Sequence, residues 1–278
     1  MGITLYKNAD WILTVNEKRE NFRHGDLLIS GKEILDVGND LEKKYAGKLQ
    51  IDKTIDAKGT VILPGFVNIH HHTWQSLIRN IQATRGLKLE PWLTVMYEIY
   101  KDLNTDVARA GVYSGLGDML KTGCTTSNDL WYPHPVGVKY LVDAEIQAAA
   151  EIGIRFHPTR GFHSVPSDIV PPEVVDTKES VTEDTIRLVK KYHDRSRFSM
   201  CQVGIAPSIA QYETEDIIEA VVDLAEEYDI MVHGHLAESQ HEVEYTLKTW
   251  GCRPFGWFKR HRLLGKRFYF AHCIHLNE

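Results

Sequence analysis

From residue 61 onward, short apolar runs rich in β-branched residues alternate with longer segments of helical periodicity. Strands that alternate with helices usually pair in parallel, so this pattern predicts a parallel sheet covered by helices. Polar residues gather where the strands end, which favours a (β/α)8 TIM-type barrel over a doubly wound sheet. The six candidate strands are 61–69, 125–130, 154–159, 201–206, 230–236 and 268–272.

The segments between these strands carry signals for the start and the end of helices. Ser180 and Glu183 have the spacing of a capping box, and Gly153 lies where a glycine ends a helix. We expect helices over 106–121 with Thr105 as N-cap, over 138–152, after Ser180, and after Thr214 as N-cap. The segment 163–178 contains three prolines and is expected to be a long loop at the active site.

The N-terminal residues follow a different pattern. Short strands are predicted over 3–5, 11–15, 27–30, 33–37 and 54–56, with a tight hairpin turn at Gly31-Lys32. We therefore expect a small β-sandwich segment over 1–58 and a barrel domain over 59–278. Only about six of the eight strand–helix units of a barrel can be found, so the barrel is expected to be incomplete here and its last strands to lie outside this sequence.

The composition excludes several classes of protein. The chain has 278 residues, 43% of them hydrophobic and 25% charged, which is typical of globular domains. Its net charge is −6, without a block of Lys or Arg, so we expect no nucleic acid and no membrane as partner. Pro64 and Gly65 interrupt the longest apolar stretch, and the first residues lack the pattern of a signal peptide. Four scattered cysteines without a CxxC motif favour a cytoplasmic location.

Histidine is the unusual residue of this chain, with 14 copies, several of them at predicted strand ends. In the motif PGFVNIHHHTWQSL, side chains alternate along the strand, so His70 and His72 face one side and His71 the other. Two imidazoles at this spacing can bind one metal ion, and histidine nitrogen suits both zinc and iron.

Two further motifs place histidines at other strand ends. In VHGHLAES, His235 lies nearest the strand end and is the better ligand, whereas His233 is interpreted as a core histidine bonded to a neighbour. Glu238 follows in the loop, where it can either exchange a proton with a metal-bound water or stabilise the start of a helix. In FAHCIHL, His272 is expected to point into the mouth of the barrel that the other two motifs face, and His275 is expected to point elsewhere or into solvent.

The motifs PGFVNIHHH, HLAE and AHCIHL, in that order, resemble the amidohydrolase superfamily. The most similar subgroup holds enzymes like cytosine deaminase, 8-oxoguanine deaminase and triazine hydrolase. The resemblance covers essentially the whole chain, including the segments GCTTSNDLW and IRFHPTRG. Three ordered motifs at separate strand ends are far more specific than any one of them.

This resemblance implies roles for individual residues. The implied ligands of one divalent ion, Zn2+ or alternatively Fe2+, are His70, His72 and His235. Glu238 matches the proton shuttle, and His272 matches the group that orients or stabilises the attacking hydroxide. The family's remaining ligand is an Asp at the end of the eighth strand, which has no match in this sequence. Asp129 lies at the second strand and is not assigned to that role.

Residues for substrate binding follow from the same resemblance. Gln75 matches a contact to the carbonyl edge of the substrate in the 8-oxoguanine-type enzymes, whereas Ser208 stands where those enzymes carry a Cys. Trp92, Trp131 and Tyr132 could line a pocket for an aromatic ring, although simple packing in the core is the favoured interpretation of each one taken individually.

The resemblance implies a metal-dependent aminohydrolase that releases ammonia from an amino-substituted N-heterocycle such as a purine, pterin or pyrimidine. Two alternatives stay open. A triazine-type hydrolase would expel chloride or an alkylamine with the same residues, and a fragment without its last strands would bind metal without catalysis. The expected partner is a small heterocyclic substrate, and the sequence leaves open whether the chain forms a homo-oligomer.

Overall fold

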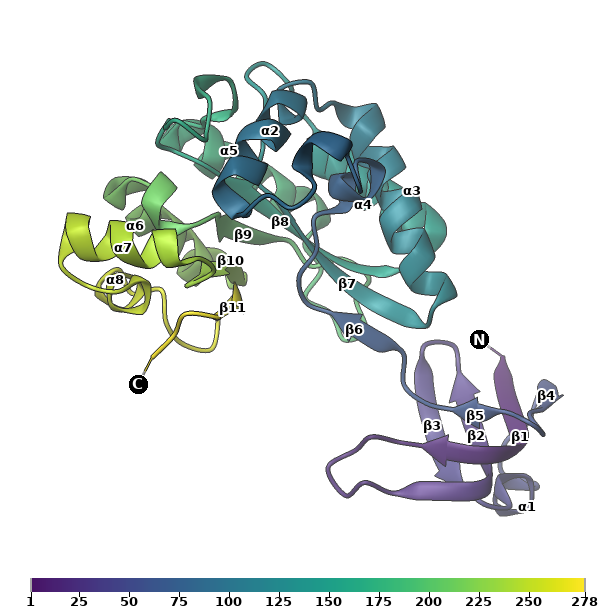
Figure 1. Ribbon diagram of the computed structural model, residues 1–278. Helices are drawn as coiled ribbons and strands as arrows, with labels where there is room; N and C mark the ends of the chain where they lie inside the picture. The colour runs from purple at the N-terminus through teal and green to yellow at the C-terminus, as the bar shows by residue number, and fades with distance from the viewer. Residues whose placement is uncertain (1, 278) are drawn as a thin grey trace. The chain divides into compact units, whose positions relative to one another are not determined.

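The structure is a computed structural model that describes residues 2–277, and it divides into two compact units. The first unit ends at Phe66 and the second begins at Val67. Each unit has its own sheet, and Figure 1 shows both sheets with their elements labelled. Each unit also has its own buried core.

The first unit is a five-stranded mixed sheet with one short helix. Its elements are β1 (Ile3–Leu13), β2 (Asn21–Ser30), β3 (Glu33–Gly38), α1 (Leu41–Tyr45), β4 (Lys53–Asp56) and β5 (Val61–Ile62). The strand order is β3-β2-β1-β4, and β5 also pairs with β1. Ser30 pairs with Glu33 across the expected two-residue turn, and Gly31 adopts the positive φ of 56° that favours glycine. The strands expected over 3–5 and 11–15 form a single strand, β1, with a register shift between Tyr6 and Ala9.

The second unit contains the parallel sheet that the sequence predicts, with six strands in the order β11-β10-β9-β8-β7-β6. The strands are β6 (Phe66–Asn68), β7 (Cys124–Trp131), β8 (Arg155–Phe162), β9 (Gly204–Pro207), β10 (Val232–Leu236) and β11 (Phe268–His272). Neighbouring strands from β7 to β11 pair in parallel. Six strands in chain order agree with the expected six units of a TIM-type barrel.

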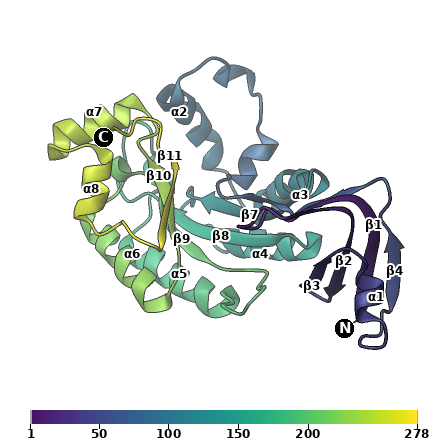
Figure 2. The same ribbon diagram turned by 90° about the horizontal axis from the view of Figure 1, so that it is seen from below.

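Helices of the second unit cover the sheet and connect its strands. The α-helices are α2 (Leu89–Tyr100), α3 (Thr105–Lys121), α4 (Leu141–Ile152), α5 (Lys178–Tyr192), α6 (Glu215–Tyr228), α7 (Gln240–Trp250) and α8 (Pro254–Arg260). Short 3-10 helices are η1 (Thr73–Leu77), η2 (Gln82–Thr84), η3 (Pro172–Val174) and η4 (Ala210–Tyr212). Figure 2 shows α4, α5 and α6 along one side of the sheet, where they contact β8, β9 and β10. Their apolar stripes build one continuous core with the strands.

Several local expectations need correction. The side chain of Asn104, not Thr105, caps α3, because it accepts bonds from the amides of Asp106 and Val107. Thr177, not Ser180, caps α5. Thr214 is the N-cap residue of α6, but its side chain makes no capping hydrogen bond there.

The strand expected over 61–69 also differs from the prediction. Pro64 and Gly65 divide it into β5, which joins the first sheet, and β6, which joins the second. A proline lacks the N–H that a strand needs, so the break falls where the sequence carries the Pro-Gly pair. Within residues 2–277, every helix is either too short or too polar to cross a membrane.

Candidate metal centre and active site

A cavity of about 310 Å3 lies at the carboxyl ends of the strands in the second unit. Polar side chains from six different strand ends or the loops that follow them line this cavity. Those expected from the sequence are His70, His72, Gln75, Trp92, Tyr132, Ser208, His235, Glu238 and His272. The carboxyl ends of the strands are the functional face of TIM-type barrels, so the cavity is the candidate active site.

Three histidines converge at one point of the cavity wall. His70 and His72 follow β6, and His235 is the fourth residue of β10. One nitrogen from each ring lies within 4.8 Å of the others, an arrangement that could hold a metal ion. The rings are packed closely, with the centroids of His70 and His72 4.8 Å apart and those of His70 and His235 5.0 Å apart.

Hydrogen bonds fix which nitrogen of each ring carries the proton. Nδ1 of His72 lies 2.7 Å from the carbonyl oxygen of Leu130, and Nδ1 of His235 lies 2.7 Å from that of Ser208. A carbonyl oxygen can only accept, so both Nδ1 atoms donate, and in a neutral ring Nε2 then keeps its lone pair. The two Nε2 atoms face each other at 3.2 Å.

Burial keeps these rings neutral. It lowers the pKa of His70 to about 3 and holds the pKa values of His72 and His235 well below that of free histidine, with smaller contributions from the neighbouring imidazoles. Two lone pairs at 3.2 Å without a proton between them repel each other, and a cation between them removes this repulsion. The donor set therefore fits a divalent ion that accepts imidazole nitrogen, such as zinc.

Glu238 lies beside this histidine cluster, in the loop between β10 and α7. Its Oε1 is 3.3 Å from Nε2 of His272, the last residue of β11. Burial, followed by repulsion from Glu242 and Glu90, raises the pKa of Glu238 to about 7. A carboxyl group with this pKa can both accept and donate a proton near neutral pH.

The backbone of the Glu238 loop is held by a buried carboxylate. Glu242 accepts hydrogen bonds from the amide of Ala237 at 3.1 Å and from the amide of Glu238 at 2.8 Å. Ser239 caps the following helix by accepting from the amide of Glu242. Ala237 has a φ of 51°, a conformation that is uncommon for a residue with a Cβ atom, so several contacts are needed to keep the loop in this shape.

Another part of the cavity wall carries aromatic rings and side-chain amides. Nε2 of Gln75, on η1, donates to the hydroxyl of Tyr100 at 3.0 Å, and it also lies 3.4 Å from the hydroxyl of Tyr132. Trp92 and Tyr132 line the cavity as the sequence suggests. Trp131 does not line it, because its fully buried ring packs against Trp74 in the core.

Several lining residues were not predicted from the sequence, including Tyr97, His163, Glu90, Gln211 and Tyr212. His163 follows β8 directly, so its place at a strand end was a signal of the same kind as that of His272. Tyr97 comes from α2, whose approach to the cavity depends on tertiary packing, and its hydroxyl is hydrogen-bonded to Nε2 of His163 at 2.5 Å.

The remaining candidates lie outside the cavity lining. His71 does not line the cavity, and its Nδ1 is 4.0 Å from Oδ1 of Asp129. Asp129 is fully buried and accepts the amide of Thr73 at 2.5 Å. His275 does not line the cavity, as expected, and its amide donates to the carbonyl of Ala237.

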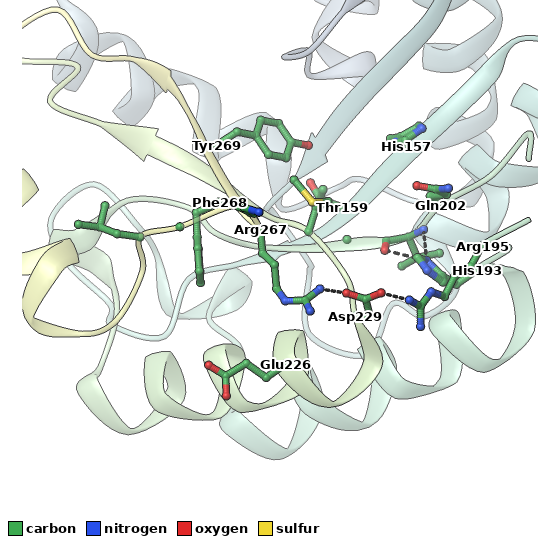
Figure 3. Close-up of a pocket in the computed structure, with 16 residues that line it drawn as sticks. His157, Thr159, His193, Arg195, Gln202, Glu226, Asp229, Arg267, Phe268 and Tyr269 are labelled. Atoms are coloured by element: carbon green, nitrogen blue, oxygen red, sulfur yellow. Dashed lines mark hydrogen bonds and ion pairs between the residues drawn. The ribbon is translucent and has the colours of Figure 1, made fainter. Parts of the chain in front are cut away.

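A larger cavity, of about 710 Å3, lies at the opposite end of the same strands (Figure 3). Residues at the starts of β8 and β11 line it, among them His157 and Phe268. Some of its charged groups pair with one another, because Asp229 forms ion pairs with both Arg195 and Arg267. The described residues around this cavity do not include a cluster of three metal-ligand side chains.

Comparison with known proteins identifies the family of the chain. Residues 61–278 match the amidohydrolase family. The chain is 32% identical over 262 residues to 8-oxoguanine deaminase of Pseudomonas aeruginosa, covering 92% of this chain and 58% of that protein. It is 30% identical over 276 residues to 5-methylthioadenosine/S-adenosylhomocysteine deaminase of Bacillus cereus, covering 99% of this chain and 59% of that protein.

The fold is similar to that of a solved structure, the atrazine chlorohydrolase of Arthrobacter aurescens complexed with zinc. The TM-score is 0.90 at 24% sequence identity, covering 99% of this chain and 61% of that one. The chain thus spans somewhat more than half the length of the relatives that it matches. Because the family match covers most of its residues and nearly all of the parallel sheet, the chain belongs to the amidohydrolase family.

Proposed function

We propose that this chain carries the metal centre of an aminohydrolase that releases ammonia from an amino-substituted N-heterocycle. The single observation that supports this most is the convergence of one ring nitrogen from each of His70, His72 and His235, in a cavity that Glu238 also lines. The names of the deaminase relatives support the same reaction class.

We infer that His70, His72 and His235 hold one divalent ion, with Zn2+ favoured over Fe2+. When bound, such an ion lowers the pKa of water towards about 7 and so supplies hydroxide at neutral pH. The zinc in the related atrazine chlorohydrolase supports the choice of metal.

The residues of the chain then move the protons. Glu238 takes a proton from the attacking water and passes it to a ring nitrogen of the substrate, since its pKa of about 7 suits both steps. His272, whose Nε2 is 3.3 Å from Glu238, orients the attacking oxygen and stabilises its developing charge. Glu238 delivers the second proton to the leaving amine, which departs as ammonia.

The cavity wall suggests a flat substrate without an anionic group. Gln75, Trp92 and Tyr132 offer an amide and two rings to a heterocycle. The residues lining the cavity within 2–277 include Glu90 and Glu238 but neither Lys nor Arg, so a phosphate would meet no Lys or Arg side chain among them. We therefore place free bases and uncharged nucleosides ahead of nucleotides as substrates.

A second candidate is hydrolysis of a triazine with chloride or an alkylamine as leaving group. Two observations favour it. The hydroxydechloroatrazine ethylaminohydrolase of a Pseudomonas strain is 27% identical over 282 residues, and the atrazine chlorohydrolase shares the fold. Ser208 stands at a position where the resemblance implies a Cys in the 8-oxoguanine-type enzymes. This is a further difference from a purine-specific site.

The test is an assay of zinc-loaded protein with aminopurines, pterins, pyrimidines and triazines, in which ammonia, chloride and alkylamine are measured separately. The proposal predicts ammonia from at least one aminated heterocycle and none after the metal is removed with a chelator. Release of chloride or alkylamine alone would establish the second candidate. Protein that binds zinc but converts none of these compounds would contradict both.

We also propose that the protein acts in the cytoplasm, since its four cysteines are free thiols.

A further inference from the structure

The ring nitrogen that each candidate ligand does not offer to an ion is held by a neighbouring group. For His72 and His235 this group is a backbone carbonyl oxygen. His70 is different, because its Nδ1 lies 2.8 Å from Nε2 of another side chain, His233. The orientation of His70 thus depends on a residue that can be replaced by mutation, whereas the other two depend on the backbone.

His233 is itself fixed from two sides. It lies in β10, is only 1% exposed, and its Nδ1 is 2.9 Å from the carbonyl oxygen of Tyr269 in β11. Its ring stacks on the ring of Tyr269, with centroids 4.2 Å apart and planes 11° apart. The hydroxyl of Tyr269 in turn accepts a hydrogen bond of 2.9 Å from Nδ2 of Asn128. The imidazole of His233 therefore cannot turn without losing its hydrogen bond to the carbonyl oxygen of Tyr269 and its stacking contact.

These contacts determine the positions of the protons. The carbonyl oxygen of Tyr269 can only accept, so Nδ1 of His233 donates to it. In a neutral ring the Nε2 atom of His233 then accepts, and the hydrogen bond to His70 requires that Nδ1 of His70 donates. The lone pair of His70 is consequently on Nε2, as in His72 and His235.

The geometry points to His233 as a positioning residue that sets the tautomer and the orientation of His70 for metal binding. This inference rests on the proposed function, namely that the three histidines bind a metal ion. Partners of this kind raise the basicity of a ligand and hold it in place, and losing one typically lowers metal affinity by about 10–100-fold.

A direct role of His233 as a ligand does not fit the same geometry. Its Nε2 lone pair is directed at Nδ1 of His70, and its Nδ1 carries the proton donated to Tyr269. Neither nitrogen is therefore free for an ion, and the group of convergent ligand atoms comprises His70, His72 and His235 without His233.

The first test measures zinc affinity by competition with a chelator in three variants. His233→Phe keeps the ring and its stacking but loses both hydrogen bonds, so we expect zinc to bind about 10–100-fold more weakly. His233→Gln offers a side-chain oxygen to Nδ1 of His70 and is expected to regain most of the affinity. Tyr269→Phe is the matched control, because it retains the stacked ring and the backbone carbonyl, and its affinity should stay within about 3-fold of the parent.

The second measurement does not depend on metal. In the metal-free parent, the 15N shifts of His70 should show the proton on Nδ1, and in His233→Phe this preference should be lost. Equal zinc affinity and an unchanged tautomer in a folded His233→Phe variant would overturn the role of His233. If the parent binds no zinc, the proposed function fails, and the tautomer of His70 in the metal-free parent still decides whether His233 sets it. If His233→Phe does not fold, the tautomer of His70 in the parent and the zinc affinity of His233→Gln decide whether His233 positions His70.

Discussion

The two ends of the parallel sheet both gather polar side chains around a cavity, yet their chemistry differs. At the carboxyl ends, the neutral rings of His70, His72 and His235 direct lone pairs at one another inside a cavity of about 310 Å3. At the amino ends, the cavity is larger, about 710 Å3, but Asp229 forms ion pairs with both Arg195 and Arg267.

The size of a cavity therefore does not identify the candidate functional end of this sheet. Groups that satisfy one another, such as the ion pairs around Asp229, need nothing further to bind. Buried groups that are left with unshared lone pairs, such as Nε2 of His72 and His235, gain from binding a cation. In TIM-type barrels this division is general, since the amino ends of the strands serve mainly stability.

The largest effect is expected when one of the three candidate metal ligands is removed. His235→Ala leaves two of the three Nε2 donors, so we expect metal-dependent activity to be lost and zinc affinity to fall by on the order of 100-fold or more. Metal content and chelator competition measure this loss. The matched control is His157→Ala, which removes a histidine at the opposite end of the strands and should leave zinc affinity unchanged. Equal affinity in the His235→Ala and parent proteins would contradict the metal site.

Glu238→Gln separates proton transfer from metal binding at the same end of the sheet. The amide has nearly the shape of the carboxyl group but cannot take up a proton, so kcat is expected to fall by about 100- to 10,000-fold. Zinc content should remain that of the parent, because Glu238 is not among the convergent ligand atoms. A metal-loaded variant that turns over at a rate near that of the parent would exclude Glu238 as the proton shuttle.

The candidate metal ligands and Glu238 could be chosen from the sequence, because their positions follow from local sequence patterns. Alternation along a strand places His70 and His72 on one face, and the HLAE motif places Glu238 three residues after His235. Most of the strand positions were predictable for the same reason, since each is a short apolar run that ends in polar residues.

What the sequence could not predict depends on groups brought together over long distances. Tyr97 reaches the cavity only through the packing of α2, and the partner of His70 is 163 positions further along the chain. Two helix caps were predicted wrongly for another reason. Asn104 and Thr105 are both good cap residues, and only the backbone conformation decides which side chain accepts the first amides.

Acid should destabilise the metal-free protein through buried histidines at the carboxyl ends. Burial lowers the pKa of His134 to about 4 and of His163 to about 3, against about 6.5 for histidine in the unfolded chain. Below pH 6.5 the unfolded state therefore binds protons that the folded state does not, and the free energy of unfolding decreases as the pH falls. Each group contributes up to about 1.4 kcal/mol per pH unit between its two pKa values.

Urea unfolding at pH 7, 6 and 5 measures this slope, and His134→Asn provides the comparison. The variant lacks one of these buried histidines, so its stability should depend less steeply on pH than that of the parent, by up to about 1.4 kcal/mol per pH unit. An identical slope in both proteins would mean that His134 takes up its proton in the folded state. Its only hydrogen bond among residues 2–277 is 3.3 Å long, to the carbonyl of Trp131, so a protonated ring would find little compensation there.

The smallest effect is expected at the amino ends of the strands, from Asp229→Asn. Asp229 has a φ of 55° at the end of α6, and asparagine tolerates this conformation as well as aspartate does. The change removes both ion pairs, but the side chains of Arg195 and Asp229 are 62% and 34% exposed, and pairs this accessible to water contribute at most about 1 kcal/mol each. We expect a loss of about 1 kcal/mol or less in urea unfolding, with unchanged zinc affinity and kcat. A marked loss of activity in a folded Asp229→Asn variant would mean that the ends of the sheet are coupled, because no ligand or proton carrier of the proposed mechanism lies near Asp229.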